Sequence, residues 1–124
     1  MALWDWLIKK RSPRLSPEQL WRVTIDQEAL EVVPPEGESQ RLLLADLSGV
    51  AVETNDTGPW GADVWWLLFG RENQLICSFP QGATGEQSVV DWMVALPDFD
   101  HGAMIRAMSS TANEIFPLWR MRTY

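Results

Sequence analysis

Six consecutive apolar residues, VWWLLF at 64–69, constrain the fold of this chain more than any other feature. Side chains of a strand alternate between its two faces, and here neither face carries a polar residue. An antiparallel strand with one hydrated face would instead alternate polar and apolar side chains. The run therefore predicts a central strand covered on both sides. We expect Trp65 and Trp66 to lie on opposite faces, both largely buried.

Two helices predicted farther along the chain can cover one face of this strand. The other face needs a cover of its own, and the sequence leaves three candidates. They are the far side of a strongly curved sheet, the N-terminal segment with Trp4 and Trp6, and a second subunit. The sequence does not decide between them.

The remaining strands are predicted from alternation and from turn residues. In WRVTID, Trp21, Val23 and Ile25 alternate with polar residues, and the polar Gln27–Glu28 pair follows as a turn. A proline- and glycine-rich break at 34–39 and a kink at 45–49 separate further apolar runs. Besides 21–26 and 64–69, these runs predict strands at 30–33, 41–44, 50–54 and 75–79.

The pattern becomes helical after Pro80. Thr84 and Gln87 have the spacing of a capping box, which predicts the start of a first helix that ends before Pro97. Asp100 is the expected N-cap of a second helix. Its apolar stripe (Met104, Met108, Ala112 and Ile115) continues to Pro117, which predicts a helix across 101–116.

Strands followed by helices indicate an α+β fold. We expect a strongly curved antiparallel sheet, or a partly open barrel, of five to six strands followed by two C-terminal helices. A short N-terminal helix over 2–9 and a linker over 11–17 precede them. The domain organisation is therefore residues 1–17 as N-terminal helix and linker, and residues 18–124 as a single domain.

Three segments, ADLSGVAVETND, WWLLFG and ALPDFD, resemble stretches in small, uncharacterised bacterial proteins with a pleckstrin-homology-like (PH-like) fold. The resemblance covers about residues 20–118. It implies a binding domain for peptides, proteins or lipid headgroups and implies no enzyme. It carries over no functional residue. The short Gln27–Glu28 turn lacks the basic residues that a phosphoinositide headgroup would need.

The net charge of −7 is unevenly distributed. Four basic residues and one acidic residue lie in the first fourteen positions, so the body of the protein is more acidic than the total. An acidic body disfavours nucleic acid, whose binding depends on phosphate contacts, and favours a basic protein partner. The single cysteine and the lack of a secretory signal pattern predict a cytoplasmic protein.

Few residues have the chemistry of an active site. His101, the one histidine, is expected to be a solvated residue of a first helical turn, and Cys77 a buried, unreactive thiol. Asp56 and Asp63 border a glycine-rich loop predicted at 56–63, but the spacing of a calcium loop is missing. We expect no metal and no cofactor.

Trp60, in the same loop, is the candidate binding residue, together with Asp56 and Asp63. Tryptophan is enriched in interface hot spots, although it also anchors loops onto a core. The hypothesis is a non-enzymatic protein-binding module, such as an inhibitor or immunity-type protein. The alternatives are a self-associating structural protein, such as a homodimer, and a small ligand-binding protein or enzyme with a pocket between sheet and helices.

Leu3, Trp4, Leu7 and Ile8 form one stripe of the predicted N-terminal helix. Apolar residues followed by Lys9 and Lys10 fit either a membrane-interface helix or a helix docked on protein. A lipid anchor usually needs a second signal, and an acidic body repels anionic membranes. We therefore expect the helix to pack on protein, its own or a neighbour's.

Overall fold

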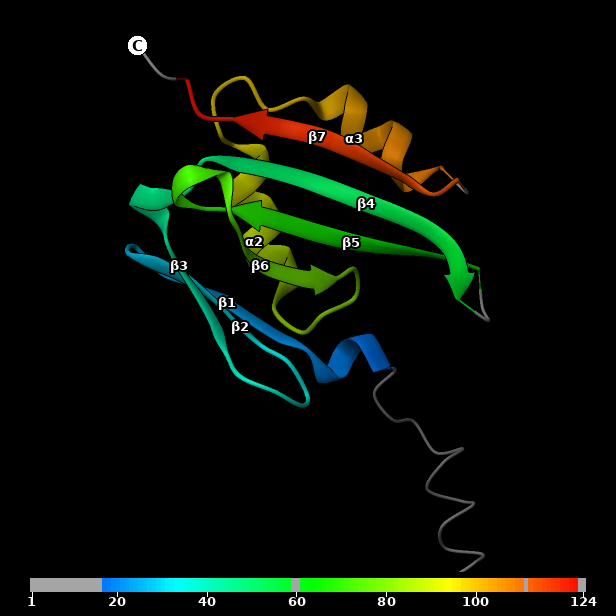
Figure 1. Ribbon diagram of the computed structural model, residues 1–124, viewed down its shortest axis with the longest axis horizontal. Coiled ribbons are helices and arrows are strands. Elements are labelled where there is room, and N and C mark those ends of the chain that lie inside the picture. The colour runs from blue at the N-terminus through cyan, green and yellow to red at the C-terminus, as the bar shows by residue number, and fades with distance from the viewer. Residues whose placement is uncertain (1–16, 59–60, 111, 123–124) are drawn as a thin grey trace, which may run out of the picture.

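The computed structural model describes residues 17–58, 61–110 and 112–122, which form two antiparallel sheets and two helices (Figure 1). The three-stranded sheet contains β1 (Arg22–Ile25), β2 (Ala29–Val33) and β3 (Gln40–Leu43). The four-stranded sheet contains β4 (Gly49–Gly58), β5 (Gly61–Phe69), β6 (Leu75–Pro80) and β7 (Glu114–Arg120). The helices are α2 (Glu86–Val94) and α3 (His101–Met108), and the short 3₁₀ turns are η1 (Pro17–Leu20), η2 (Leu44–Asp46) and η3 (Arg71–Asn73).

The three-stranded sheet has the order β1-β2-β3. Its first hairpin is closed by Asp26, whose carboxylate accepts hydrogen bonds from the backbone N–H of Ala29 at 2.9 Å and of Glu28 at 2.7 Å. These bonds, that of Ala29 first, lower the pKa of Asp26 because they favour its charged form. The predicted turn at Gln27–Glu28 is confirmed.

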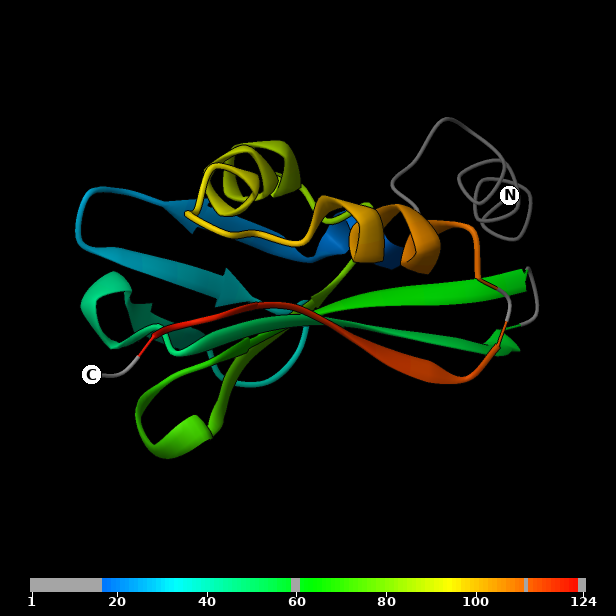
Figure 2. The same ribbon diagram turned by 90° about the horizontal axis from the view of Figure 1, so that it is seen from above.

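The four-stranded sheet has the order β6-β5-β4-β7, so β5 is a central strand as its apolar sequence predicted. Both helices lie on one side of this sheet (Figure 2). Trp66 and Leu68 of β5 point to the helix side and are 2% and 0% exposed. The largest fully buried side chains of the described residues include Trp66, Phe79, Leu30, Leu47, Leu68, Met93 and Leu118.

The two sheets are adjacent but do not close into a barrel. The side-chain carbonyl of Gln40 on β3 accepts a hydrogen bond from the backbone N–H of Ser78 on β6, at 3.0 Å. Near the start of β1, the N–H of Val23 donates to the carbonyl of Thr84 at 2.8 Å. The strands are therefore divided between two sheets, instead of forming the one sheet predicted from the sequence.

The second predicted helix is half as long as expected, because β7 occupies its C-terminal part. Helix α3 ends at Met108, and the hydroxyl of Ser109 donates to the carbonyl of Ile105 at 3.1 Å, which competes with further helix formation. The chain then pairs along β4, with Phe116 opposite Val52. The free edge of β4 supplies hydrogen bonds that local helix periodicity cannot reveal. The predicted helix over 101–116 was wrong beyond Met108.

Pro117 lies within β7 instead of ending a helix. Proline has no N–H to donate and is therefore confined to edge strands or bulges. β7 is an edge strand, and its register with β4 shifts between Val50 and Ala51, where Leu118, next to Pro117, has no partner on β4. The hydroxyl of buried Thr54 fastens the start of β7, donating to the carbonyls of Ala112 at 2.7 Å and Glu114 at 3.3 Å.

The predicted loop at 56–63 is largely strand. β4 continues to Gly58 and β5 begins at Gly61, with Asn55 opposite Asp63 and Gly58 opposite Gly61. Neither β6 nor β7 pairs with this part of the hairpin, so its tip extends beyond the rest of the sheet. Polar residues are compatible with strand there because the tip lies outside the core.

The start of α2 differs from the predicted capping box. Gly85 is the N-cap, with a left-handed φ of 91°, and no side chain caps the helix. The hydroxyl of Thr84 donates instead to the carbonyl of Gln19 at 2.8 Å. The N-cap of α3 is as predicted, since the carboxylate of Asp100 accepts from the N–H of Ala103 at 2.9 Å.

Residues 1–16 lie outside the described part of the chain. The predicted N-terminal helix over 2–9 and most of the linker over 11–17 fall in this range and stay predictions.

Candidate functional site

The side of the four-stranded sheet opposite the helices is the candidate site, and we call it the outer face. The alternation of β5 places Trp65, Leu67 and Phe69 on it, away from α2 and α3. The strand register adds residues from β4, β6 and β7. The outer face consists of Gly49, Ala51, Glu53, Trp65, Leu67, Phe69, Ser78, Ile115, Pro117 and Arg120.

The centre of the outer face is apolar, and Glu53, Ser78 and Arg120 are the polar residues of the face. Ala51 and Leu67 at its centre are 5% and 7% exposed. Trp65 and Phe69 are partly exposed, and Ile115 is 55% exposed. The prediction for Trp66 is confirmed, whereas Trp65 is only partly buried. An apolar sheet face that stays open in this way is typical of an interaction surface.

A hollow of about 620 Å³ lies at the β4–β7 end of the outer face. Gly49, Phe69, Ile115 and Pro117 line its apolar part. It extends around the edge strand to Asp98, Asp100 and Arg120, so its apolar walls meet charged groups of both signs. Asp98 is ion-paired with Arg122 at 2.8 Å, which, among the described residues, leaves Asp100 as the acidic group without an ion pair there. This arrangement can take an apolar side chain that lies next to a basic group.

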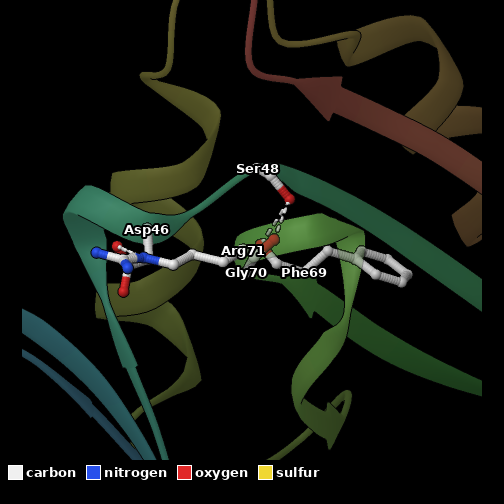
Figure 3. Close-up of polar contacts among 5 residues, drawn as sticks. All are labelled: Asp46, Ser48, Phe69, Gly70 and Arg71. Carbon is white, nitrogen blue, oxygen red and sulfur yellow. Dashed lines mark hydrogen bonds and ion pairs between the residues drawn. The ribbon is translucent and has the colours of Figure 1, made fainter.

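Two turns fix the backbone at this end of the outer face (Figure 3). The hydroxyl of Ser48, just before β4, donates to the carbonyl of Gly70 at 2.6 Å and is 3.3 Å from that of Phe69. Arg71 forms an ion pair with Asp46 at 2.9 Å. The arginine side chain is 82% exposed, so the Ser48 bonds contribute more to rigidity than this ion pair.

The opposite end of the outer face adjoins the start of the described chain. The rings of Trp21 and Trp65 are 5.3 Å apart and meet edge to face at 87°. Leu20, the last residue of η1, is 47% exposed beside them. The chain therefore enters the domain at the Trp65 end of the outer face.

Two of the three residues predicted as a binding site lie close together in the described backbone. Asp56 is in β4 and Asp63 in β5, both near the tip of the extended hairpin. Trp60 lies outside the described residues, between the two strands. Their role in binding stays a prediction.

Sequence reasoning did not identify Ile115 and Pro117 as surface residues of a sheet. It assigned both to a helix or its end. A signal was available in the sequence, because β-branched and aromatic residues such as Ile115 and Phe116 favour strands. This strand preference prevails over the helical pattern because the edge of β4 is free to pair with these residues.

Little in the described residues resembles a catalytic centre. His101 is exposed on the first turn of α3, with its ring 5.0 Å from that of Phe99, as the sequence predicted for a solvated residue. The hollow is lined by Asp98 and Asp100 but not by His101. Within residues 17–58, 61–110 and 112–122, no three histidine, cysteine, aspartate or glutamate side chains are grouped so that they could hold a metal ion.

Cys77 is fully buried on β6, as predicted, and burial raises the pKa of its thiol to about 12. We expect native protein to resist alkylation by iodoacetamide at pH 8 and unfolded protein to react.

The raised pKa of Cys77 also makes stability depend on pH. Because the folded pKa is raised, the thiol's contribution to stability is complete below the unfolded pKa and is lost as the pH rises towards 12. Denaturant melts at pH 8 and pH 10 check this, since Cys77→Ala should lose less stability between them.

No family model, curated protein or solved structure matches this chain. In the part of the chain that is described, no helix has both the length and the apolar character needed to cross a membrane. The function is therefore inferred from the surface itself.

Proposed function

We propose that this protein is a non-enzymatic cytoplasmic protein-binding module that uses the outer face to bind its partner. The observation that carries the proposal is the exposed apolar side of the sheet, with Trp65 and Phe69 partly exposed and Ile115 at 55%. Interfaces commonly have such an aromatic and aliphatic centre within a polar rim. The residues predicted from the sequence as a binding site, Asp56, Trp60 and Asp63, are proposed to form part of the polar rim of this interface.

The proposed partner is basic. The support for this is the net charge of −7, because the hollow itself is bordered by Arg120 as well as by Asp98 and Asp100. Opposite charges accelerate association and select partners more than they raise affinity. An inhibitor or immunity-type protein that acts on a basic toxin or enzyme would have these properties.

Three finer features of the fold are part of this proposal. The first is a likeness to PH-like domains. The second follows from it: the two sheets would form one strongly curved, partly open barrel, which the Gln40–Ser78 hydrogen bond between β3 and β6 supports. The third is the N-terminal helix over 2–9. PH-like domains are binding domains, which agrees with a module that has no reaction of its own.

The test is a matched pair of substitutions on exposed isoleucines. Ile115 on the outer face and Ile105 on α3 are 55% and 66% exposed, so either can become glutamate without opening the core. The measurement is cross-linking of the protein to its partner in cells. We expect the cross-link to be lost with Ile115→Glu and retained with Ile105→Glu. Both variants should keep a cooperative unfolding transition, which shows that the domain itself stays folded.

Recovery of the same partner with both variants would reject the outer face as the binding surface. Loss of self-association with Ile115→Glu, and of no other contact, would assign the face to a homodimer. Insensitivity of the complex to salt would argue against a basic partner, because exposed charges are screened by salt.

A further inference from the structure

We propose that the chain's own N-terminal segment, residues 2–10, docks on the outer face. The face is apolar at its centre and open at Ile115, and both helices lie on the other side of the sheet (Figure 2). The sequence predicted that β5 is covered on both sides. In the described residues, the helices cover one of these sides. The N-terminal segment is an apolar stretch outside the described residues that could cover the other.

The path of the chain places this segment at the outer face. The described chain begins at η1, and the ring of Trp21 contacts Trp65 at one end of the outer face. From there, the six residues 11–16 can span up to about 20 Å when extended. The segment therefore starts close to its proposed site and has enough chain to lie along it.

The dimensions of segment and face agree. A helix over 2–9 would be about 12 Å long. The strand from Trp65 to Phe69 covers about 13 Å. A helix of this length lying along β5 would reach from the Trp21 contact to the Phe69 side of the hollow, with Ile115 beside its Trp65 end across β4.

The chemistry also agrees. Leu3, Trp4, Leu7 and Ile8 form an apolar stripe that matches the apolar centre of the face. Lys9 and Lys10 follow it, and Glu53 lies at the Trp65 end of the outer face, whereas Arg120 lies at the Gly49 end. Docking would bury the stripe on protein and leave the lysines next to an acidic domain.

This arrangement makes the segment a competitor of the proposed partner. In the unbound protein the segment covers the outer face, and a partner must displace it. This second part rests on the proposed function, whereas the docking itself does not.

Paramagnetic broadening in full-length protein tests the docking. A nitroxide is attached to Ala2→Cys, and Cys77 does not interfere because it is buried with a raised thiol pKa. We expect loss of the methyl signals of Ile115 and Leu67, with those of Ile105 unaffected. A label at Ser88→Cys on exposed α2 is the control, which should leave Ile115 unchanged.

Leu3→Ser with Leu7→Ser, in the labelled protein, should restore the Ile115 signal. Unchanged Ile115 and Leu67 signals in the parent labelled protein would overturn the docking. So would broadening seen only in unlabelled copies mixed with labelled ones, since that places the segment on a second molecule. Sedimentation with anionic phosphatidylglycerol vesicles together with full Ile115 signal would assign the segment to lipid and also overturn it.

The competition is measured with the cross-linked partner once it is identified. The double serine variant should bind it about fivefold more tightly or better, the lower end of typical coupling between two ligands of one site. Equal binding would overturn the competition. If no partner exists, the broadening result still decides the docking, so the two proposals fail separately.

Discussion

Trp66→Ala is expected to destabilise the protein by about 3–5 kcal/mol, the usual cost of emptying a buried aromatic site. Trp66 is 2% exposed, and its ring stacks on Phe79 with centroids 6.4 Å apart. Its indole N–H also donates to a carboxylate oxygen of Glu86 at 2.8 Å. The alanine variant loses the packing and leaves Oε2 of Glu86 without its partner, while Oε1 still accepts from the N–H of Gly82 at 3.0 Å. Equilibrium denaturation by urea, with the slope checked for two-state behaviour, measures the loss.

Two further variants separate the contributions. Trp66→Phe keeps most of the packing but not the N–H. Its free energy of unfolding should fall by the small packing loss plus about 1–2 kcal/mol for the missing hydrogen bond to Glu86. Trp65→Ala removes the same residue type from the outer face, where the ring is partly hydrated, and should cost less than Trp66→Ala. Equal losses at positions 65 and 66 would mean that the outer face is as well covered as the core.

The central place of β5 could be predicted because the information is local. A strand without polar residues on either face has few stable positions other than the middle of a sheet. The same holds for the Gln27–Glu28 hairpin and for Asp100, where a turn or a cap depends on residues close in sequence. These parts of the fold were predicted correctly.

β7 could not be predicted in the same way, because its partner is distant in the chain. Met104 and Met108 begin a good helical stripe, and Ile115 continues its spacing. The edge of β4, some sixty residues earlier in sequence, decides against the helix. β7 pairs with this edge, and the hydroxyl of Thr54 donates to the carbonyl of Ala112 just before β7. Pairing across such a separation overrides local periodicity.

The candidate site shows the same division between local and distant information. The aromatic residues of β5 were recognised as needing a cover on both faces, and the three possible covers were stated from the sequence. Ile115 and Pro117, which complete the outer face, depend on the β4–β7 pairing and were missed. The hollow beside them also arises from that pairing, since Pro117 lies at the register shift.

Gly85→Ala should lower the stability by about 3 kcal/mol or more, a large effect for adding one methyl group. Gly85 is the N-cap of α2 with φ at +91°. A methyl group built there would lie 2.1 Å from the carbonyl oxygen of Val23 on β1. That oxygen belongs to backbone, so either β1 or the start of α2 must move. Urea denaturation of the variant measures the cost.

Gly37→Ala is the control, because it isolates the backbone cost from the collision. Gly37 has a similar φ of +97°, but a methyl group there would have no neighbour within 4 Å. Alanine in the left-handed region costs about 1–2 kcal/mol, and this is the loss expected at position 37. The excess at position 85 then measures how rigidly α2 is held against Val23 of β1. Equal losses in the two variants would mean that α2 and β1 separate at little cost, contrary to the buried contact between Val23 and the helix start.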